Sequence, residues 1–294
     1  MDGKLVIQWY PGHMVKAKRM VKEHLKLVDV VIEIVDARVP LSSRNPDLEE
    51  ITKQKPRIVV LNKIDLANEQ ATTQWLKYFR SRGYGAVGVN SITGQGLNQV
   101  IQLAKKMAAE KLAKMAEKGM RPRAVRALIV GIPNVGKSSI INKLVGKVTA
   151  KTGDRPGVTK GKQWVRVNPE FELLDTPGIL WPKFEDPEVG LKLAFTGAIS
   201  DVIMDLEELV YRLLAHLSQH QPEGLTTRYK LTELKEDPVE ILEQIGTKRG
   251  CLISGGRIDR LKAAILILDE FRAAKLGRIT LDEIPDENPN ENLN

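Results

Sequence analysis

The chain has 294 residues, of which 42% are hydrophobic and 28% charged, as in globular proteins with one large or two smaller domains. No apolar run reaches the roughly 18 residues of a membrane span, and the first residues lack the pattern of a signal peptide. We therefore expect a cytoplasmic protein with no membrane contact. Cys251 is the one cysteine, which excludes an intramolecular disulfide and argues against a cysteine-based metal site.

The charge is uneven along the chain. The net charge is +8, but the last thirteen residues, 282–294, carry five acids and no Lys or Arg. The remaining residues hold all 45 Lys and Arg but only 32 of the 37 Asp and Glu, which is a net charge of +13. Such an excess attracts polyanions, with nucleic acid as the first candidate, although a merely well-solvated basic surface is the alternative.

Strands and helices are predicted to alternate in the first part of the chain. A basic, helix-compatible segment at 14–27 precedes a β-branched run at 28–40, which is typical of a strand covered on both faces. A second such run, 57–65, is followed by a predicted helix over 68–81 and by a short strand that ends at Asn90.

A long helix is predicted over 96–119, because its apolar residues recur at helical spacing and Gly119 and Pro122 end it. Two further strands, ending at Val167 and Asp175, are expected before the chain becomes mainly helical at about residue 186. The alternation predicts an α/β doubly wound sheet, and the remainder predicts a second, all-helical domain.

A phosphate-binding loop is indicated by residues 131–138, "GIPNVGKS", which match G-x-x-x-x-G-K-[ST] between a predicted strand and a predicted helix. The glycines let backbone N–H groups surround phosphate oxygens, Lys137 supplies a positive charge, and the Ser138 hydroxyl binds magnesium. The alternative is an ordinary glycine turn. The expected nucleotide contacts in this loop are Asn134, Val135, Gly136, Lys137, Ser138 and Ser139.

A second motif that indicates phosphate binding is the segment "DTPG", residues 175–178, at the end of a predicted strand. In phosphate-loop enzymes such an Asp holds magnesium, usually through water, and the Gly N–H meets the γ-phosphate. These roles fall to Asp175 and Gly178. Alone the tetrapeptide could be any turn, but its place after the phosphate loop strengthens the signal.

A glycine-rich basic stretch, 150–161, lies between these two motifs. Thr149, Thr152 and Thr159 could each offer a hydroxyl to magnesium there. The alternative is that this stretch is only a connection.

A base-reading motif, "NKID", follows the second predicted strand. Guanine presents N1–H and its N2 amino group as adjacent donors, which the Asp65 carboxylate can accept together, whereas adenine cannot satisfy it. Asn62 would bond the base and brace the site, and the Lys63 stem would lie over the ring. Asn90 and Ser91, at the end of the next strand, could place the Ser91 N–H near guanine O6. A plain turn with a helix cap at Asp65 is the alternative.

The order of these motifs is unusual. They resemble those of Ras-like GTPases, in which the phosphate loop comes first and the base-reading motif later. Here the order is reversed, as a circular permutation would produce if residues 96–119 were the last helix of the usual fold, joined to its first strand. The chain after Gly178 would then run directly into the helical domain, which could pass on changes at the γ-phosphate.

The full set of motifs is similar to that of the ribosome biogenesis GTPase A family of bacterial circularly permuted GTPases, and it covers nearly the whole chain. The motifs are Trp9-Tyr10-Pro11-Gly12-His13-Met14, Asp36-Ala37-Arg38-Val39-Pro40, Asn62-Lys63-Ile64-Asp65, residues 131–138 and residues 175–178. The resemblance implies GTP hydrolysis stimulated by the ribosomal particle, late in assembly of the large subunit. It also implies a C-terminal domain that contacts rRNA. Thr159 ends a Pro-Gly-Val-Thr segment that matches the family, and the resemblance therefore favours Thr159 as the magnesium ligand.

Two residues bear on the mechanism. Ile179 stands where Ras-like enzymes have a Gln that orients the attacking water. Because its side chain forms no hydrogen bond, another residue must orient the water. The resemblance implies His13 as that helper and Asn134 as a ligand for a potassium ion. The alternatives are a structural or RNA-contacting His13 and a plain loop residue at 134. We thus assign catalysis to His13, Lys137, Thr159 and Gly178.

These observations predict three parts and one function. The parts are a permuted GTPase domain over 1–185, a helical RNA- or ribosome-binding domain over 186–281 and an acidic, disordered tail over 282–294. The predicted function is a GTPase that binds the large-subunit precursor with GTP and Mg²⁺, aided by K⁺, as a monomer in solution. The alternative is a nucleotide-gated RNA-binding protein whose turnover is incidental.

Overall fold

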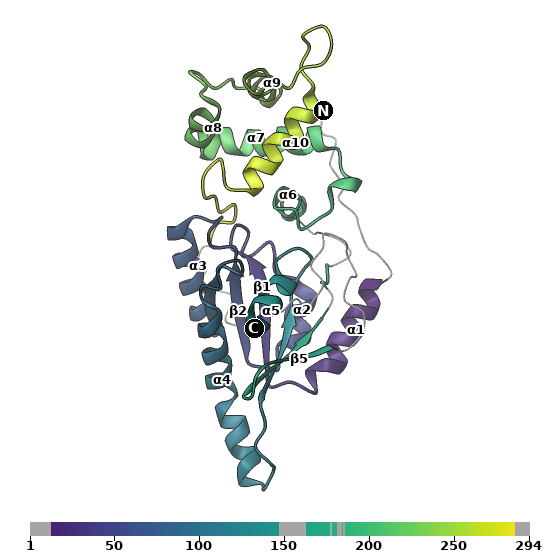
Figure 1. Ribbon diagram of the computed structural model, residues 1–294, viewed down its shortest axis with the longest axis vertical. Coiled ribbons are helices and arrows are strands. Elements are labelled where there is room, and N and C mark those ends of the chain that lie inside the picture. The colour runs from purple at the N-terminus through teal and green to yellow at the C-terminus, as the bar shows by residue number, and fades with distance from the viewer. Residues whose placement is uncertain (1–12, 147–162, 177, 181–183, 185, 286–294) are drawn as a thin grey trace, which may run out of the picture.

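The centre of the molecule is a six-stranded sheet in the order β3-β2-β1-β4-β6-β5 (Figure 1). The structure is a computed structural model that describes residues 13–146, 163–176, 178–180, 184 and 186–285. Neighbouring strands are parallel except that β5 pairs antiparallel with β6. The strands are β1 Val30–Asp36, β2 Arg57–Asn62, β3 Gly85–Val89, β4 Val125–Val130, β5 Gln163–Asn168 and β6 Phe171–Asp175.

The central strands are rich in Val and Ile because helices cover both faces of the sheet. All seven residues of β1 are buried. On one face, Trp75 and Phe79 pack with Val59 and Leu61 of β2, while α4 belongs to the main core cluster. The helices around the sheet are α1 His13–Leu25, α2 Pro46–Thr52, α3 Glu69–Ser81, α4 Leu97–Glu117 and α5 Lys137–Val145. The predicted doubly wound α/β sheet is confirmed.

The connection from α4 to β4 is the join that a permutation requires, and Asp29 anchors it. This buried carboxylate pairs with Arg123 in the connection at 2.7 Å and with Lys111 of α4 at 2.5 Å, and it accepts from Arg126 N–H at 3.0 Å. Burial alone would raise the pKa of Asp29, but these partners outweigh it and lower the pKa to about 2. The ionised side chain thus ties α4 and the connection to the start of β1.

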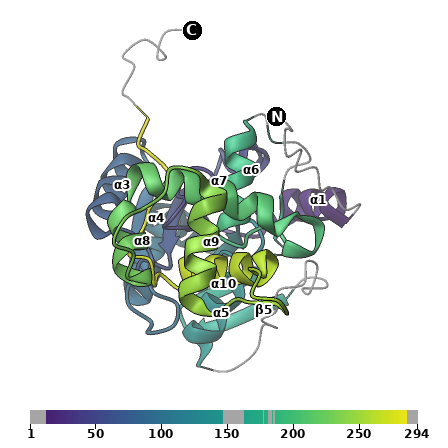
Figure 2. The same cartoon turned by 90° about the horizontal axis from the view of Figure 1, so that it is seen from above.

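A helical part with its own core lies over the carboxyl ends of the strands (Figures 1 and 2). It consists of α6 Pro187–Phe195, the 3₁₀ turn Asp201–Ile203, α7 Leu206–His220, α8 Pro222–Tyr229, α9 Pro238–Arg249 and α10 Arg260–Arg272. None of the helices in the described residues is long and apolar enough to cross a membrane. The division of the chain into domains at residues 185 and 186 stays a prediction.

The predicted start of the acidic tail at residue 282 is wrong. Asp282 is buried, and its carboxylate accepts from the N–H groups of Leu41 and Ser42, each at 2.8 Å, and pairs with Lys192 at 3.1 Å. Just before it, Leu281 N–H donates to Arg38 O at 2.7 Å. The acid is held in place because its charge meets donors on both the sheet side and the helical side.

Candidate functional site

The carboxyl ends of four neighbouring strands bring the sequence motifs together. β2 ends at Asn62, β1 at Asp36, β4 at Val130 just before the phosphate loop, and β6 at Asp175. In a parallel sheet these ends lie along one edge, which is where open α/β sheets bind ligands. Segments that are far apart in the sequence therefore form one site.

The phosphate loop presents the start of a helix. Gly136, immediately before α5, has a φ of 97°, and a Cβ there would lie 2.2 Å from Asn62 Nδ2. Only glycine fits this close approach. Because Gly136 has no side chain to cap α5, the N–H groups of Lys137, Ser138 and Ser139 at the first turn are left for an anion.

Lys137 is turned back onto its own loop. Its Nζ donates to Ile132 O at 2.6 Å, and 8% of the residue is exposed. Burial lowers the pKa of Lys137 to about 8, although the negative charge of Asp175 acts in the opposite direction. A Cβ on Gly178 would lie 3.0 Å from Lys137 Nζ and 2.8 Å from Pro133 N. The structure thus places Lys137, the buried Asp175 and Gly178 together.

Asn62 connects the base-reading motif to two other loops. It is fully buried, its Nδ2 donates to Val135 O at 2.8 Å, and its Oδ1 accepts from Ser91 N–H at 3.2 Å. One carboxamide therefore holds the phosphate loop, the end of β2 and the loop after β3 in a fixed arrangement. The predicted role of Asn62 was to contact the base as well as to brace the site, and its contact with the base stays a prediction.

Lys63 and Asn134 are in contact, and each has an unusual backbone conformation. Their φ angles are 63° and 59°, in the left-handed region that non-glycine residues rarely adopt. Lys63 Nζ donates to Asn134 O at 2.9 Å, and Asn134 Nδ2 donates in turn to Gly197 O, beyond the end of α6, at 2.9 Å. Backbone strain of this kind persists where surrounding contacts hold it, and it often marks functional sites.

Asp36 and Arg38 form a buried ion pair that sequence reasoning missed as part of the site. Arg38 Nε and Nη2 donate to the two carboxylate oxygens of Asp36 at 2.9 and 2.8 Å, and Lys63 Nζ lies 2.8 Å from the same carboxylate. Burial would raise the pKa of Asp36, but Lys63 and Arg38 hold it well below its usual range. The sequence carried a signal for this pair, because Asp36 ends a mainly apolar strand and Arg38 follows two residues later, but these residues were noted only as part of a shared motif.

The remaining base-reading residues lie at the same edge. Asp65 is half-buried, and its negative charge, after that of Asp36, helps raise the pKa of Arg38 against the effect of burial. The Ser91 N–H, expected near guanine O6, is engaged by Asn62. Asn90 Oδ1 accepts from the N–H groups of Ile92 and Thr93 and so orders its own loop. Nucleotide contacts of Asn90 and Ser91 stay predictions.

Two of the expected site residues cannot be placed. Thr159 lies outside the described residues, as do Thr149 and Thr152. His13 begins α1, but its side chain is outside the described part of the chain. Their roles stay predictions.

The described residues fit a magnesium ion shared with a nucleotide. Among them no group of three or more His, Cys, Asp or Glu side chains could hold a metal ion by itself. The Ser138 hydroxyl at the start of α5 and the Asp175 carboxylate at the end of β6 are hard oxygen donors. Mg²⁺ typically binds one or two such groups and completes its shell with phosphate and water.

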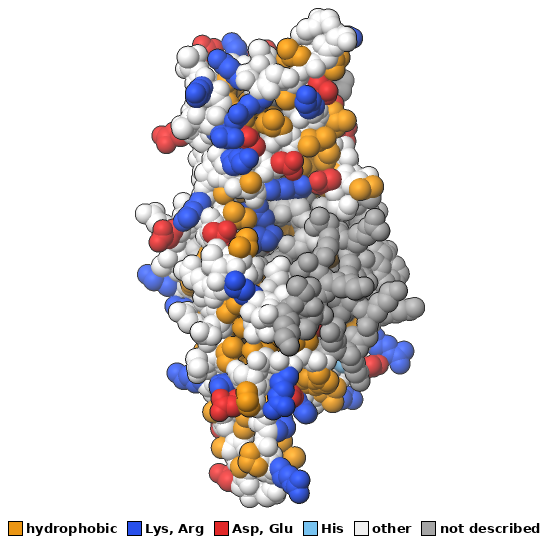
Figure 3. Space-filling model, viewed as in Figure 1, with side chains coloured by type: hydrophobic (Ala, Val, Ile, Leu, Met, Phe, Trp, Pro, Cys, Tyr) orange, Lys and Arg blue, Asp and Glu red, His pale blue; other side chains and the backbone are white. Residues whose placement is uncertain are grey.

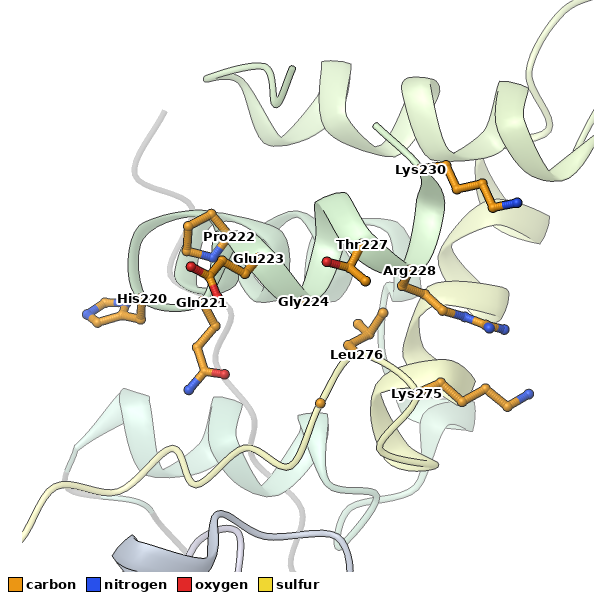
Figure 4. Close-up of a pocket in the computed structure, with 11 residues that line it drawn as sticks. His220, Gln221, Pro222, Glu223, Gly224, Thr227, Arg228, Lys230, Lys275 and Leu276 are labelled. Atoms are coloured by element: carbon orange, nitrogen blue, oxygen red, sulfur yellow. The ribbon is translucent and has the colours of Figure 1, made fainter. Parts of the chain in front are cut away.

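A hollow of about 860 Å³ lies elsewhere, in the helical part between α8 and residues 275–277 (Figure 4). Three cationic side chains, Arg228, Lys230 and Lys275, extend in the same direction at one end of it. Arg228 is held there by Glu270, whose carboxylate accepts from its Nε at 3.0 Å. On the face in Figure 3, Lys and Arg side chains are spread over the helical part with acidic ones among them.

Replacing Lys137 by Met should stabilise the protein at pH 7 by about 1–3 kcal/mol. Each pKa unit corresponds to about 1.4 kcal/mol, and the lost hydrogen bond to Ile132 O offsets part of the gain. The unfavourable buried charge is fully present below pH about 8 and disappears as the pH approaches 10.5, the ordinary value, at which the unfolded chain also loses its proton. Urea unfolding of the nucleotide-free protein should therefore show a smaller difference at pH 10 than at pH 7.

Lys143→Met is the control, because Lys143 lies on the same helix but is exposed. It should show no comparable difference between the two pH values. A Lys137→Met protein that is less stable than wild type to the same extent at both pH values would contradict the burial effect.

Comparison with known proteins agrees with the motifs and the geometry. Residues 126–249 match a family described as "50S ribosome-binding GTPase". Ribosome biogenesis GTPase A from Bacillus cereus is 56% identical over 283 residues, which cover 96% of this chain and 95% of that protein.

Two solved structures are similar along almost their whole length. A GDP-bound structure of TM YlqF has a TM-score of 0.64 and 28% identity, and the match covers 90% of this chain and 99% of that one. GNP-bound YlqF from T. maritima gives 0.63 and 28%, over 91% and 98% of the two chains. The chain thus belongs to the ribosome biogenesis GTPase A family and is a circularly permuted GTPase that binds GTP.

Proposed function

We propose that this GTPase binds the precursor of the large ribosomal subunit in its GTP form, promotes a late maturation step and is released after hydrolysis. One contact above all supports a nucleotide-controlled switch. Asn134 of the phosphate loop donates directly to Gly197 O in the helical part. A change at the phosphates could therefore alter how the helical part sits on the sheet. The protein would act as a monomer in the cytoplasm.

The loop before α5 would make the contacts with the phosphates. N–H groups from Asn134 to Ser139 would surround the phosphates, and Lys137 would leave Ile132 O to meet them. Ser138, Asp175 through water and Thr159 would hold Mg²⁺, which neutralises charge on the phosphates, and the Gly178 N–H would meet the γ-phosphate.

Residues at the end of β2 and just after it would make the contacts with the base. Asp65 would accept from guanine N1–H and N2, and Asn62 would contact the base while bracing the loops. The Lys63 stem would cover the ring, and Asn90 and Ser91 would border O6. Asn62 supports this arrangement, because its present contacts already bring the phosphate loop against the base-reading motif.

Catalysis requires a helper other than residue 179. Ile179 is fully buried, its N–H donates to Gly131 O and its carbonyl accepts from Asn45. Its apolar side chain therefore serves the core and cannot orient water. We assign the water-orienting role to His13 and a potassium site to Asn134, whose contact with Gly197 uses Nδ2 and leaves Oδ1 to bind a cation.

Two comparisons of turnover test these assignments. His13→Ala should lower the rate of hydrolysis with little change in GTP affinity, since a transition-state contact is lost. Wild-type turnover should fall when sodium replaces potassium. Full activity of His13→Ala with large subunits present, or equal rates in the two salts, would remove the corresponding assignment.

The helical part is the proposed rRNA-contacting surface. The cationic end of the hollow, with Arg228, Lys230 and Lys275, offers charges to a phosphate backbone, and the chain carries an excess of basic residues. Contacts of this kind are sensitive to salt, because each neutralised phosphate releases counterions.

Co-sedimentation with purified large subunits tests the proposed function. Association should be strong with a non-hydrolysable GTP analogue, weak with GDP and steeply reduced by salt. Lys137→Ala should lose the nucleotide effect. Equal sedimentation with both nucleotides, or binding to small subunits only, would contradict the proposal. A turnover rate unchanged by large subunits that do bind would instead favour a nucleotide-gated RNA-binding protein.

A further inference from the structure

The end of α6 is held by three side chains from other parts of the chain. The last carbonyls of a helix lack partners within the helix and carry the negative end of its dipole. On the helical side, Arg272 of α10 donates to Phe195 O at 3.0 Å and to Ala194 O at 2.8 Å, and it pairs with Asp201 at 2.7 Å. Arg272 thus fixes α6 within the helical part.

The next two carbonyls are bound from the nucleotide site. Arg38 Nη2 donates to Thr196 O at 3.2 Å, and Asn134 Nδ2 donates to Gly197 O. Arg38 Nη1 also reaches Arg272 O, at the end of α10, at 3.3 Å. The negative ends of two helix dipoles therefore converge on the guanidinium of Arg38, a residue that is 2% exposed.

The same two residues hold the base-reading loop. Arg38 binds both oxygens of Asp36, and Asp36 in turn holds Lys63 Nζ, which also donates to Asn134 O. The strained conformations of Lys63 and Asn134 thus depend on contacts that continue to α6. A shift of α6 would remove partners from Arg38 and Asn134 together.

We propose that the Asp36–Arg38 pair is a positioning element that couples the docking of α6 to guanine nucleotide binding. With α6 docked, Arg38 fixes Asp36, and Asp36 fixes Lys63 beside the phosphate loop. Undocking frees Lys63 and Asn134 and weakens the nucleotide site. Because coupling is reciprocal, bound nucleotide stabilises the docked α6. The inference rests on the proposed position of the nucleotide and gives a role to the Asp36-Ala37-Arg38 motif.

The first test measures nucleotide affinity of the full chain without ribosomal particles. Arg38→Gln should weaken GDP binding at least about fivefold, the lower end of typical coupling between sites. Arg272→Gln should weaken it in the same direction, although that side chain contacts α6 and Asp201 rather than the nucleotide site. Arg38→Lys keeps the charge beside Asp36 but not the fork that reaches two carbonyls, so it should stay weakened.

Arg44→Gln is the matched control. Arg44 is largely buried, with 9% of its side chain exposed. It pairs with Glu33 of β1 at 2.9 Å and lies over the Tyr84 ring, so its loss should cost stability. Its described contacts all lie within the sheet part, and GDP affinity should not change. Equal affinity losses in Arg38→Gln and Arg44→Gln, or wild-type affinity in Arg272→Gln or Arg38→Lys, would overturn the proposal.

The second test measures hydrogen exchange of the amides at 196–198, which close the end of α6. GDP should slow their exchange in the wild-type protein and should do so much less in Arg38→Gln. No effect of GDP on wild-type exchange would overturn the coupling. Wild-type protein that binds no GDP would overturn the nucleotide site itself, and the role on the large subunit does not enter either test.

Discussion

Four adjacent strands that end at one edge of a single sheet are the constraint on which this site depends. β2, β1, β4 and β6 are neighbours and parallel, so Asn62, Asp36, the phosphate loop and Asp175 must lie side by side. Strand order does not depend on where the chain begins, which is why a permuted sequence can keep the same site. The covalent join moves to the opposite edge, where Asp29 and Arg123 hold it.

The buried polar side chains at this edge all have hydrogen-bond partners, and they depend on those partners. Asn62, Asp36 and Arg38 are almost inaccessible to water, and an unpaired polar group there would be costly. Each therefore requires its partners in place. Because two partners of Arg38 are carbonyls at the ends of α6 and α10, the sheet edge is most stable when the helical part is docked.

Placing the helical part beyond Gly178 gives the permutation a mechanical consequence. The chain passes from β6 and Ile179 into α6 with few residues between. The segment that follows the γ-phosphate contact in such enzymes is thus directly connected to the helix whose end Asn134 and Arg38 hold. The nucleotide site and the helical part are thus linked along the chain, by the segment after Gly178, and through space, by the contact of Asn134 with Gly197.

The strands and the main motifs could be predicted because the residue patterns that indicate them are local, and the alternation of strands with helices then predicted the sheet. β-branched runs indicated β1 and β2, and the spacing of residues 131–138, between a predicted strand and a predicted helix, indicated the phosphate loop. Contacts between distant residues could not be predicted: Arg38 and Arg272 are 234 positions apart. Asp282 was assigned to a disordered tail for the same reason. The composition of residues 282–294 resembles that of a tail, but the position of Asp282 is set by N–H groups near residue 41.

The central claim is that guanine is read at the end of β2, beside the phosphate loop. The most direct measurement is titration of Asp65→Asn with GTP and with xanthosine triphosphate, whose O2 can accept a hydrogen bond from the new amide. The account predicts weaker GTP binding and a gain of xanthosine triphosphate binding. An Asp65→Asn protein with the wild-type preference for GTP would contradict it.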